Sequence, residues 1–154
     1  MPASDDVVSV ERVIAAPPEK IFELLANPSR HHDIDGSGTV REAKNAPERV
    51  ALGDTFGMSM KMGIPYSMVS TVIELEDNRR IAWQTRGPGK IGQRVGGRIW
   101  RYELEPIEGG ASTRVREIWD LSEEKGKFVA KLGAAKTRKN MEATLARIEE
   151  LVTG

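Results

Sequence analysis

Apolar and polar residues alternate with a period of two along much of the chain, and this period is typical of half-buried β-strands. The clearest example is residues 55–61, where Phe56, Met58, Met60 and Met62 share one side. Thr55, Gly57, Ser59 and Lys61 take the other side. Patterns of this kind and turn residues between them predict seven strands, at 7–14, 39–43, 55–61, 66–75, 80–86, 98–105 and 113–121.

Two segments follow a helical period instead. Pro18 opens a short helix whose apolar side carries Ile21, Phe22, Leu24 and Leu25. Asn27-Pro28 ends it, because the residue before a proline is pushed out of the helical region. A second short helical turn is expected over 28–33. Residues 126–152 predict one long helix, with an apolar stripe at Phe128, Leu132, Ala135, Met141, Leu145, Ile148 and Val152.

This order of elements predicts an α+β domain with a curved, seven-stranded antiparallel sheet. One side of such a sheet needs an apolar cover, and the C-terminal helix is the only predicted element long enough to supply it. The 154 residues suit a single domain. We therefore expect one domain over 7–154, preceded by a flexible N-terminus over 1–6.

The motif Ala16-Pro17-x-x-x-Ile21-Phe22 directly follows the first predicted strand. With the strand and helix order above, the chain resembles the START/Bet v 1-like (SRPBCC) superfamily of polyketide cyclases and small lipid carriers. The resemblance implies a helix-grip fold, in which the sheet wraps around the long C-terminal helix and encloses a cavity. It also implies a hydrophobic small molecule as ligand.

Composition narrows the functional classes. Lys plus Arg and Asp plus Glu both total 23, so net charge favours neither DNA nor membranes as partners. The chain has no cysteine, which excludes disulfides and thiol chemistry. Neither a secretion signal nor a run of about 20 apolar residues is present, so we expect a cytoplasmic protein without a transmembrane segment. No motif indicates a cofactor.

Methionine and aromatic side chains are the candidates for the wall of a ligand cavity. Methionine adapts its shape to an apolar guest, and Trp and Tyr combine a large apolar body with a polar tip. The same residues would equally serve as an ordinary core. The predicted lining residues are Phe56, Met58, Met60, Met62, Met68, Trp83, Trp100, Tyr102, Glu117, Trp119, Arg138 and Met141.

Glu117 is the first candidate for proton chemistry. It shares a strand side with Val115 and Trp119, so it should point inward, where burial would raise its pKa. The alternatives are a β-bulge in the strand, or an arginine partner such as Arg98 or Arg138 that neutralises the carboxylate. Tyr102 and Arg138 are further catalytic candidates, although Arg138 would equally extend its charged end into water.

His31 and His32 are the only histidines, and Asp33 and Asp35 follow them. Adjacent side chains diverge by about 100° on a helix and point to opposite sides of a strand, so we expect no metal site. One histidine at the mouth of the cavity, His31, is a candidate base or ligand contact. A solvent-exposed pair is the alternative.

The segment Gly87–Gly97 is rich in glycine and resembles a phosphate-binding loop only superficially. The required glycine and the Ser or Thr after the lysine are missing, so we expect a loop at the cavity rim. The surrounding residues 79–101 are basic without an acidic residue. They form either a partner-binding rim or a surface balanced by Glu74, Glu76, Asp77 and Glu103.

Three functions remain open on these grounds. The first is binding or transport of a hydrophobic lipid or polyketide-like molecule. The second is a cyclase, aromatase or dehydratase reaction at Glu117, His31, Arg138 or Tyr102. The third is a protein- or RNA-interaction domain that uses the basic rim at 86–101.

Overall fold

The structure is a computed structural model that describes residues 6–36, 40–44, 48–62, 64–87 and 96–154, with the backbone alone at 40–44, 59–62 and 64–66. The described elements are β1 (Val7–Ile14), α1 (Pro18–Ala26), η1 (Pro28–Arg30), α2 (His31–Ile34), β2 (Val40–Lys44), β3 (Thr55–Met62), β4 (Ile64–Glu76), β5 (Arg80–Arg86), β6 (Gly96–Ile107), η3 (Glu108–Gly110), β7 (Ser112–Asp120), α3 (Lys127–Leu132) and α4 (Ala134–Thr153).

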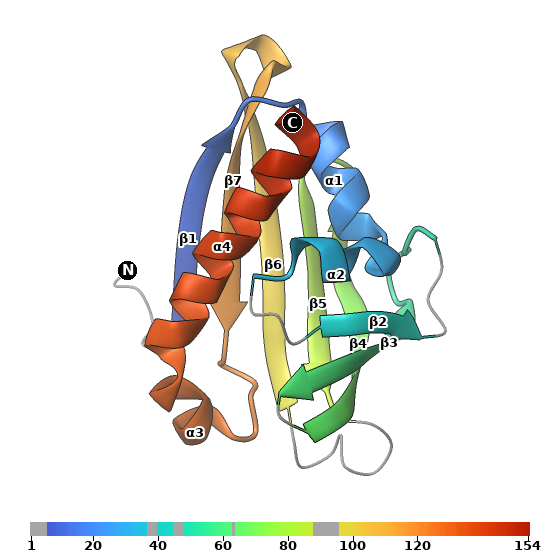
Figure 1. The fold of residues 1–154 in the computed structure, drawn as a ribbon, viewed down its shortest axis with the longest axis vertical. Helices are drawn as coiled ribbons and strands as arrows, with labels where there is room; N and C mark the ends of the chain where they lie inside the picture. Colours follow the sequence, from blue (N-terminus) through green and yellow to red (C-terminus); the bar gives the residue numbers. More distant parts are fainter. Residues whose placement is uncertain (1–5, 37–39, 45–47, 63, 88–95) are drawn as a thin grey trace.

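The described strands form one antiparallel sheet in the order β1-β7-β6-β5-β4-β3-β2. Consecutive strands β2 to β7 are neighbours, and β1 joins the sheet at its far edge by pairing with β7 (Figure 1). The fold is therefore α+β, with an antiparallel sheet and a C-terminal helix, consistent with a helix-grip arrangement. Each predicted strand is present, and the ends differ by no more than two residues.

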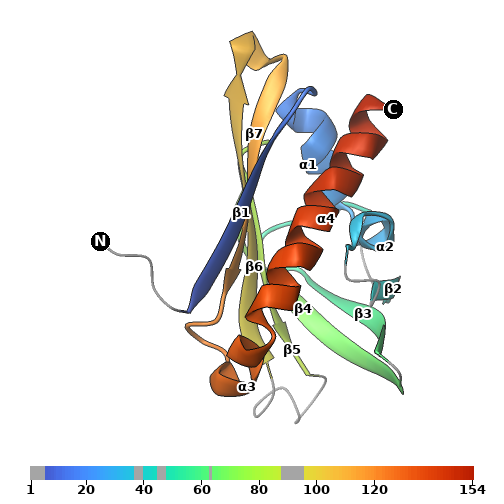
Figure 2. The ribbon, with the colours of Figure 1, turned by 60° about the vertical axis from the view of Figure 1, so that its left-hand side comes forward.

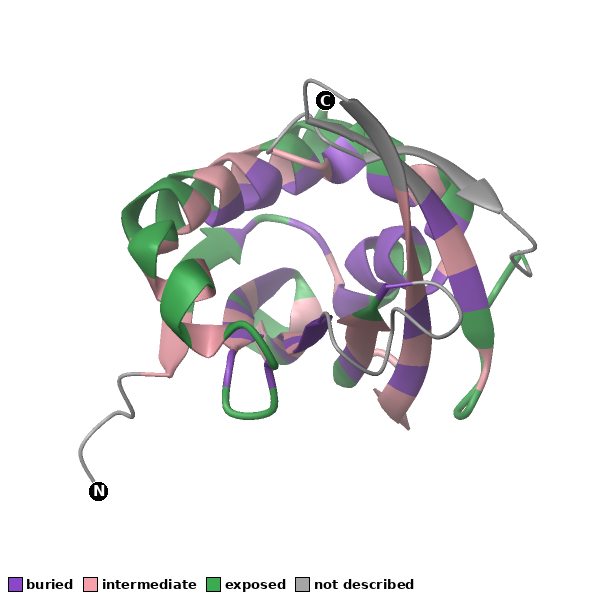
Figure 3. Ribbon diagram, turned by 90° about the horizontal axis from the view of Figure 1, so that it is seen from below, coloured by how far each residue is buried: buried purple, intermediate pink, exposed green. Residues whose placement is uncertain are grey.

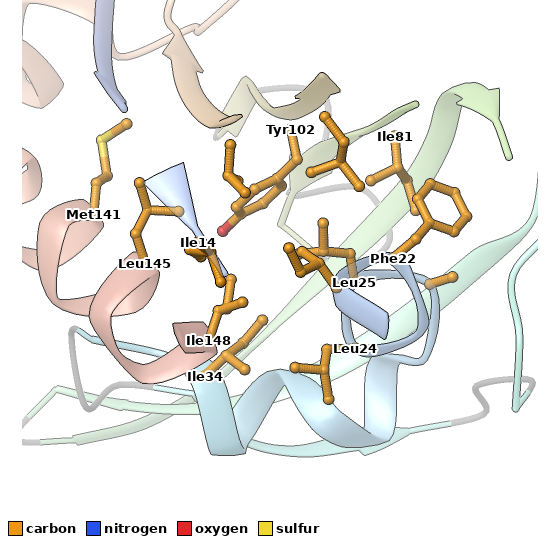
Figure 4. Packing of buried hydrophobic residues seen from close by; sticks show 14 of the residues in the cluster. Ile14, Phe22, Leu24, Leu25, Ile34, Ile81, Tyr102, Met141, Leu145 and Ile148 are labelled. Carbon is orange, nitrogen blue, oxygen red and sulfur yellow. The ribbon is translucent and has the colours of Figure 1, made fainter. Parts of the chain in front are cut away.

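The helices α1, α2 and α4 lie on the same side of the sheet (Figure 2). Buried and partly exposed positions alternate along the strands, and α4 is buried along the side that it turns to the sheet (Figure 3). Between these layers, Leu145 and Ile148 of α4 face Phe22 and Leu25 of α1, with Tyr102 between them (Figure 4). The side of the sheet that α4 covers is called the inner side below.

The short helix α1 forms as the sequence predicts. Pro18 occupies its first turn, where a missing N–H costs no hydrogen bond. Ile21, Phe22 and Leu25 are buried, and they fix α1 against the core. Asn27 is extended, with φ −111° and ψ 101°, and its side chain accepts a 3.0 Å hydrogen bond from the Ser29 N–H, which starts η1.

The prediction of one continuous helix over 126–152 is wrong. The segment divides at Gly133 into α3 and α4, with Gly133 at φ −96° and ψ 10°. Glycine is the least favourable ordinary residue in a helix interior, and α3 has no buried side chain that would compensate for it. Phe128 and Leu132 are consequently 77% and 75% exposed rather than part of the core stripe.

Several expectations fall on residues outside the description. Residues 1–5 of the N-terminus that was predicted to be flexible lie outside the described part, while Asp6 forms ion pairs with Lys127 and Lys131 of α3. The loop predicted over 87–97 is described only at its ends, and Gly96 and Gly97 belong to β6. Gly97 has φ +111°, and a Cβ there would lie 2.2 Å from the Glu123 carbonyl oxygen. Only glycine suits this crossing of two backbones.

Candidate functional site

The candidate site lies on the inner side of the sheet, where β6 and β7 are paired. Register places Tyr102 opposite Glu117 and Trp100 opposite Trp119. Because side chains alternate between the two sides of a strand, all four point toward the helices. Val115 and Trp119 are 0% and 2% exposed, so Glu117 sits between two buried apolar residues.

Glu117 is a buried carboxyl without a cationic partner among the described residues. It is 2% exposed, and burial raises its pKa from 4.5 to about 8, with Asp35 adding to the rise. A hydrogen bond with the Tyr102 hydroxyl acts in the opposite direction. Burial in turn raises the pKa of Tyr102 well above its ordinary value, so its hydroxyl keeps the proton. At neutral pH the pair is therefore mostly uncharged.

Two buried polar atoms on the inner side of β7 have no hydrogen-bond partner in the described structure. They are Oε1 of Glu117 and Nε1 of Trp119. Both residues are on β7, two positions apart, so their Cα atoms are separated by about 7 Å. An unpartnered buried polar group costs about 1–3 kcal/mol, and native proteins contain few of them. These two atoms are therefore unsatisfied polar groups in an otherwise apolar layer.

His31 of α2 closes this region from the opposite side. Its Nε2–H donates a 2.8 Å hydrogen bond to the Leu25 carbonyl oxygen. The ring stacks on Trp83, with centroids 4.8 Å apart and planes at 21°, and meets Phe56 edge-on at 5.6 Å. Burial lowers the pKa of His31 from 6.5 to about 4, so it is neutral at pH 7. These contacts place His31 in the apolar layer on the inner side of the sheet, where its Nε2 proton is held in the hydrogen bond to the Leu25 carbonyl oxygen.

Aromatic rings extend this wall across the sheet. The Trp83 and Tyr102 centroids are 5.7 Å apart, and the Trp100 and Trp119 centroids are 6.0 Å apart. Trp83 and Trp100 are only partly buried although their strand positions face the helices. The cover over this part of the inner side is therefore incomplete, which leaves aromatic surface accessible next to the Glu117–Tyr102 pair.

Most of the other predicted lining residues lie in the same layer. Phe56 and Met58 are 2% and 6% exposed, as the alternation in β3 predicts, and Met141 of α4 is 1% exposed. Met68 pairs with Met58 across β3 and β4 and is partly buried. The side chains of Met60 and Met62 fall outside the description. Whether this layer receives a ligand stays a prediction.

Arg138 is a correction to the predicted site. It is exposed, and its Nη1 donates a 3.0 Å hydrogen bond to the Ser9 carbonyl oxygen on β1. Arg138 shares a helical stripe with Met141 and Leu145, but its long side chain extends to the edge strand β1, so the charge avoids burial. Arg138 therefore neither lines the interior nor pairs with Glu117.

Arg98 also fails to neutralise Glu117. Its Nε donates a 2.8 Å hydrogen bond to Oε1 of the buried Glu124, and its guanidinium lies 6.0 Å from the centre of the Trp119 ring. The sequence pattern predicts neither this pair nor the effect of Asp35, which follows α2 and raises the pKa of Glu117. No local sequence pattern relates Asp35 to a strand about 80 positions later.

Three of the described basic residues from 79 to 101 form ion pairs with acidic side chains. Arg80 pairs with Glu103, Arg101 with Glu74, and Arg98 with Glu124. These three pairs favour the interpretation as a balanced surface, and Glu103 and Glu74 are among the acidic partners that were predicted. Residues 88–95, with Lys90 and Arg94, lie outside the description.

A separate groove of about 300 Å³ lies on the opposite side of the sheet. Its walls are charged, with ion pairs such as Arg114–Glu11 and Arg114–Glu105 across neighbouring strands. This lining does not suit an apolar molecule. Among the described residues, no group of three His, Asp or Glu side chains is arranged to bind a metal ion.

Comparison with known proteins agrees with this architecture. Residues 6–153 match the family described as "Polyketide cyclase / dehydrase and lipid transport". The chain belongs to this family. Family membership makes the domain a ligand-binding fold of the SRPBCC type. It names neither the ligand nor a reaction for this chain.

A curated protein is also similar to this chain in sequence. An uncharacterised protein of Mycobacterium tuberculosis, Rv0088, is 34% identical over 144 residues, covering 89% of this chain and 60% of that protein. The chain thus spans about 60% of the length of the curated relatives it matches.

Solved structures show the same fold at low identity. Protein CV1439 from Chromobacterium violaceum has a TM-score of 0.74 at 16% identity, with 98% of this chain and 99% of that chain covered. A protein from Arthrobacter aurescens, solved by NMR, has a TM-score of 0.73 at 14% identity, with 97% and 87% covered. None of the helices in the described part of the chain is both long and apolar enough to span a membrane.

Proposed function

We propose that this family member binds a largely apolar small molecule carrying a hydroxyl or keto oxygen, on the inner side of the sheet beside Glu117 and Trp119. One observation carries the proposal: the buried Oε1 of Glu117 and Nε1 of Trp119 lack partners within the described structure. A ligand oxygen near them would remove the cost of leaving these atoms unsatisfied.

The apolar character of the ligand follows from its surroundings. Trp83, Trp100 and Tyr102 present ring surface, and Phe56 and Met58 extend it toward β3. Burial of apolar ligand surface contributes roughly 25 cal/mol per Å², and methionine adjusts to differently shaped guests. A flat or flexible lipid- or polyketide-like compound fits this chemistry.

The polar atoms would orient such a ligand. The Trp119 indole only donates, so it requires an oxygen acceptor. Glu117 is mostly protonated at neutral pH, because burial raises its pKa to about 8, and it can donate to one group while accepting from another. A carbonyl or hydroxyl oxygen meets both requirements, whereas a carboxylate would be repelled once Glu117 ionises.

The test is a search for the ligand followed by a matched pair of variants. Native mass spectrometry of the protein purified from its own host should show a co-purified small molecule. In titrations with that compound, Trp119→Phe should weaken binding about 2- to 12-fold, the range for one neutral hydrogen bond. Trp100→Phe, the same substitution at the paired position on β6, should change affinity less.

The opposite results would reject the proposal. If no compound co-purifies, and a hydrophobic fluorescent probe does not bind the native protein, the inner side is an ordinary core. Equal losses in Trp119→Phe and Trp100→Phe would show that the indole N–H does not contact the ligand.

A second candidate function is an acid-base reaction on a polyketide-like substrate, as in cyclases and dehydratases. The observation that favours it is the buried Glu117, whose pKa of about 8 lies close to neutrality, in contact with the Tyr102 hydroxyl. A carboxylic acid with this pKa is suited to proton transfer near pH 7. Glu117→Gln should then lower the rate about 10²-fold or more with little change in affinity. An unchanged rate would reject the acid-base reaction and leave ligand binding as the only proposed function.

A further inference from the structure

The short helix α3 exposes its apolar residues to solvent. Phe128, Val129 and Leu132 are 77%, 72% and 75% exposed. The helix lies at the end of the molecule opposite the C-terminus, where α4 begins (Figure 1). Soluble domains rarely leave adjacent large apolar side chains uncovered, and such patches often mark interaction surfaces.

Specific contacts fix α3 in this orientation. Lys127 and Lys131, one turn apart, bind the two carboxylate oxygens of Asp6 at 3.2 and 2.7 Å. The N–H of Gly126, just before the helix, donates a 2.8 Å hydrogen bond to Glu124, which is itself paired with Arg98. The polar side of α3 thus faces the protein and its apolar side faces solvent, which reverses the usual arrangement of a surface helix.

Positive charge is concentrated in the segment that carries this apolar surface. Residues 125–139 contain six basic residues and no acidic one, and of these six Lys127 and Lys131 are paired with Asp6. Lys125, Lys136 and Lys139 are exposed, the first before the apolar residues in the sequence and the other two after them. Apolar side chains bordered by lysines are the pattern of helices that lie in the interface of an anionic lipid bilayer.

We propose that α3 and the first turns of α4 dock the protein on an anionic lipid surface, with Phe128, Val129 and Leu132 inserted among the head groups. The surrounding lysines would contact the lipid phosphates. This proposal rests on the exposed surface alone and does not depend on the proposed ligand site.

The charge and the apolar side chains of this surface together favour a bilayer over other binding partners. A second copy of the chain, packed through the same surface, would bring two clusters of like charge together. A nucleic acid would satisfy the lysines but leave the three apolar side chains in water. An anionic bilayer accommodates both features.

The test is flotation of the purified protein with vesicles of phosphatidylcholine, alone or mixed with phosphatidylglycerol. The protein should float with the anionic vesicles only, and added salt should release it. Phe128→Ser combined with Leu132→Ser should lower the partition coefficient about tenfold or more, because less apolar area is inserted. Leu52→Ser, at a site 63% exposed elsewhere on the surface, is the matched control and should have no effect.

A second pair of variants tests the charges. Each cationic residue near an anionic membrane contributes about fivefold to partitioning, so Lys136→Glu with Lys139→Glu should lower it about 25-fold or more. Lys20→Glu with Arg147→Glu changes net charge equally on exposed positions of α1 and of the C-terminal half of α4, and should retain most binding. All of these positions are exposed, so circular dichroism should remain unchanged.

Three results would overturn the proposal. The first is no flotation with either type of vesicle, and the second is equal losses in the variants and their controls. The third is a dimer in light scattering that Phe128→Ser dissociates, since the surface would then serve self-association.

Discussion

At the scale of single residues, two buried titratable groups have pKa values shifted in opposite directions. Burial raises the pKa of Glu117 from 4.5 to about 8 and lowers that of His31 from 6.5 to about 4. Folded Glu117 retains a proton that the unfolded chain releases, so its contribution to stability falls as pH rises from 4.5 to 8. In the unfolded chain His31 binds a proton that the buried ring does not bind, so its contribution to stability falls as pH drops from 6.5 to 4.

These opposite dependences predict a specific pH profile. The two effects oppose one another between pH 4.5 and 6.5, and Glu117 acts alone between pH 6.5 and 8. Between pH 6.5 and 8, the free energy of unfolding of the wild type should fall by about 1.4 kcal/mol per pH unit relative to that of Glu117→Gln, whose side chain cannot ionise.

Urea unfolding at pH 6.5 and 7.5 measures this difference. The exposed Glu105→Gln is the control, and its difference from the wild type should stay constant. A constant difference for Glu117→Gln as well would mean that Glu117 is already ionised at pH 6.5, and the acid-base candidate function would lose its basis.

The sequence predicted which way Glu117 points but not what it contacts. Its direction follows from the period of two that places it between Val115 and Trp119, and this period needs no tertiary information. Its surroundings depend on long-range register and on α2, which bring Tyr102 and Asp35 to it. Residue type alone suggested Arg98 as partner, yet Arg98 pairs with Glu124, a contact that only the folded chain determines.

At the scale of elements, periodicity predicted the sheet better than the C-terminal helix. Seven strands with short connections leave few alternative pairings, and the observed order uses neighbours throughout except for β1. The helix prediction relied on an apolar stripe that crosses Gly133 without interruption. Spacing alone cannot show that Phe128 and Leu132 have no core to pack against, because that depends on where the sheet ends.

The two glycines at element boundaries should respond oppositely to alanine. At Gly133 a Cβ would meet only the Ala130 carbonyl oxygen at 3.7 Å, and its φ of −96° suits any residue. Gly133→Ala should therefore stabilise the protein by about 0.4–1 kcal/mol through a less flexible unfolded chain. Gly97→Ala would place a Cβ 2.2 Å from the Glu123 carbonyl oxygen at φ +111°, and should destabilise by about 2 kcal/mol or more.

Chemical denaturation measures the free energy of unfolding of both variants. Far-ultraviolet circular dichroism shows whether helix content rises in Gly133→Ala. Destabilisation by Gly133→Ala would indicate that the break between α3 and α4 is required by contacts of the folded state. A neutral Gly97→Ala would mean that the approach of β6 to Glu123 is not tight in solution.

At the scale of the whole molecule, α4 connects β1 at the edge of the sheet with the segment that follows α2. Arg12 of β1 donates a 2.8 Å hydrogen bond to Glu149, and the Thr144 hydroxyl accepts a 2.8 Å hydrogen bond from the Gly36 N–H after α2. Met141, Leu145 and Ile148 are each no more than 1% exposed. The part of α4 from Met141 onward therefore closes the core, while Phe128, Val129 and Leu132 of α3 stay exposed to solvent.

This division predicts unequal costs for the same substitution at two leucines. Leu145 is 1% exposed and Leu132 is 75% exposed. Leu145→Ala removes buried methyl groups and leaves a cavity between α4 and the sheet, so it should lower the free energy of unfolding by about 2–5 kcal/mol. Leu132→Ala should change it by less than about 0.5 kcal/mol, because no core contact is lost. Equal effects in urea denaturation would show that α3 packs against the protein in solution, and the exposed surface proposed to bind lipid would then not exist.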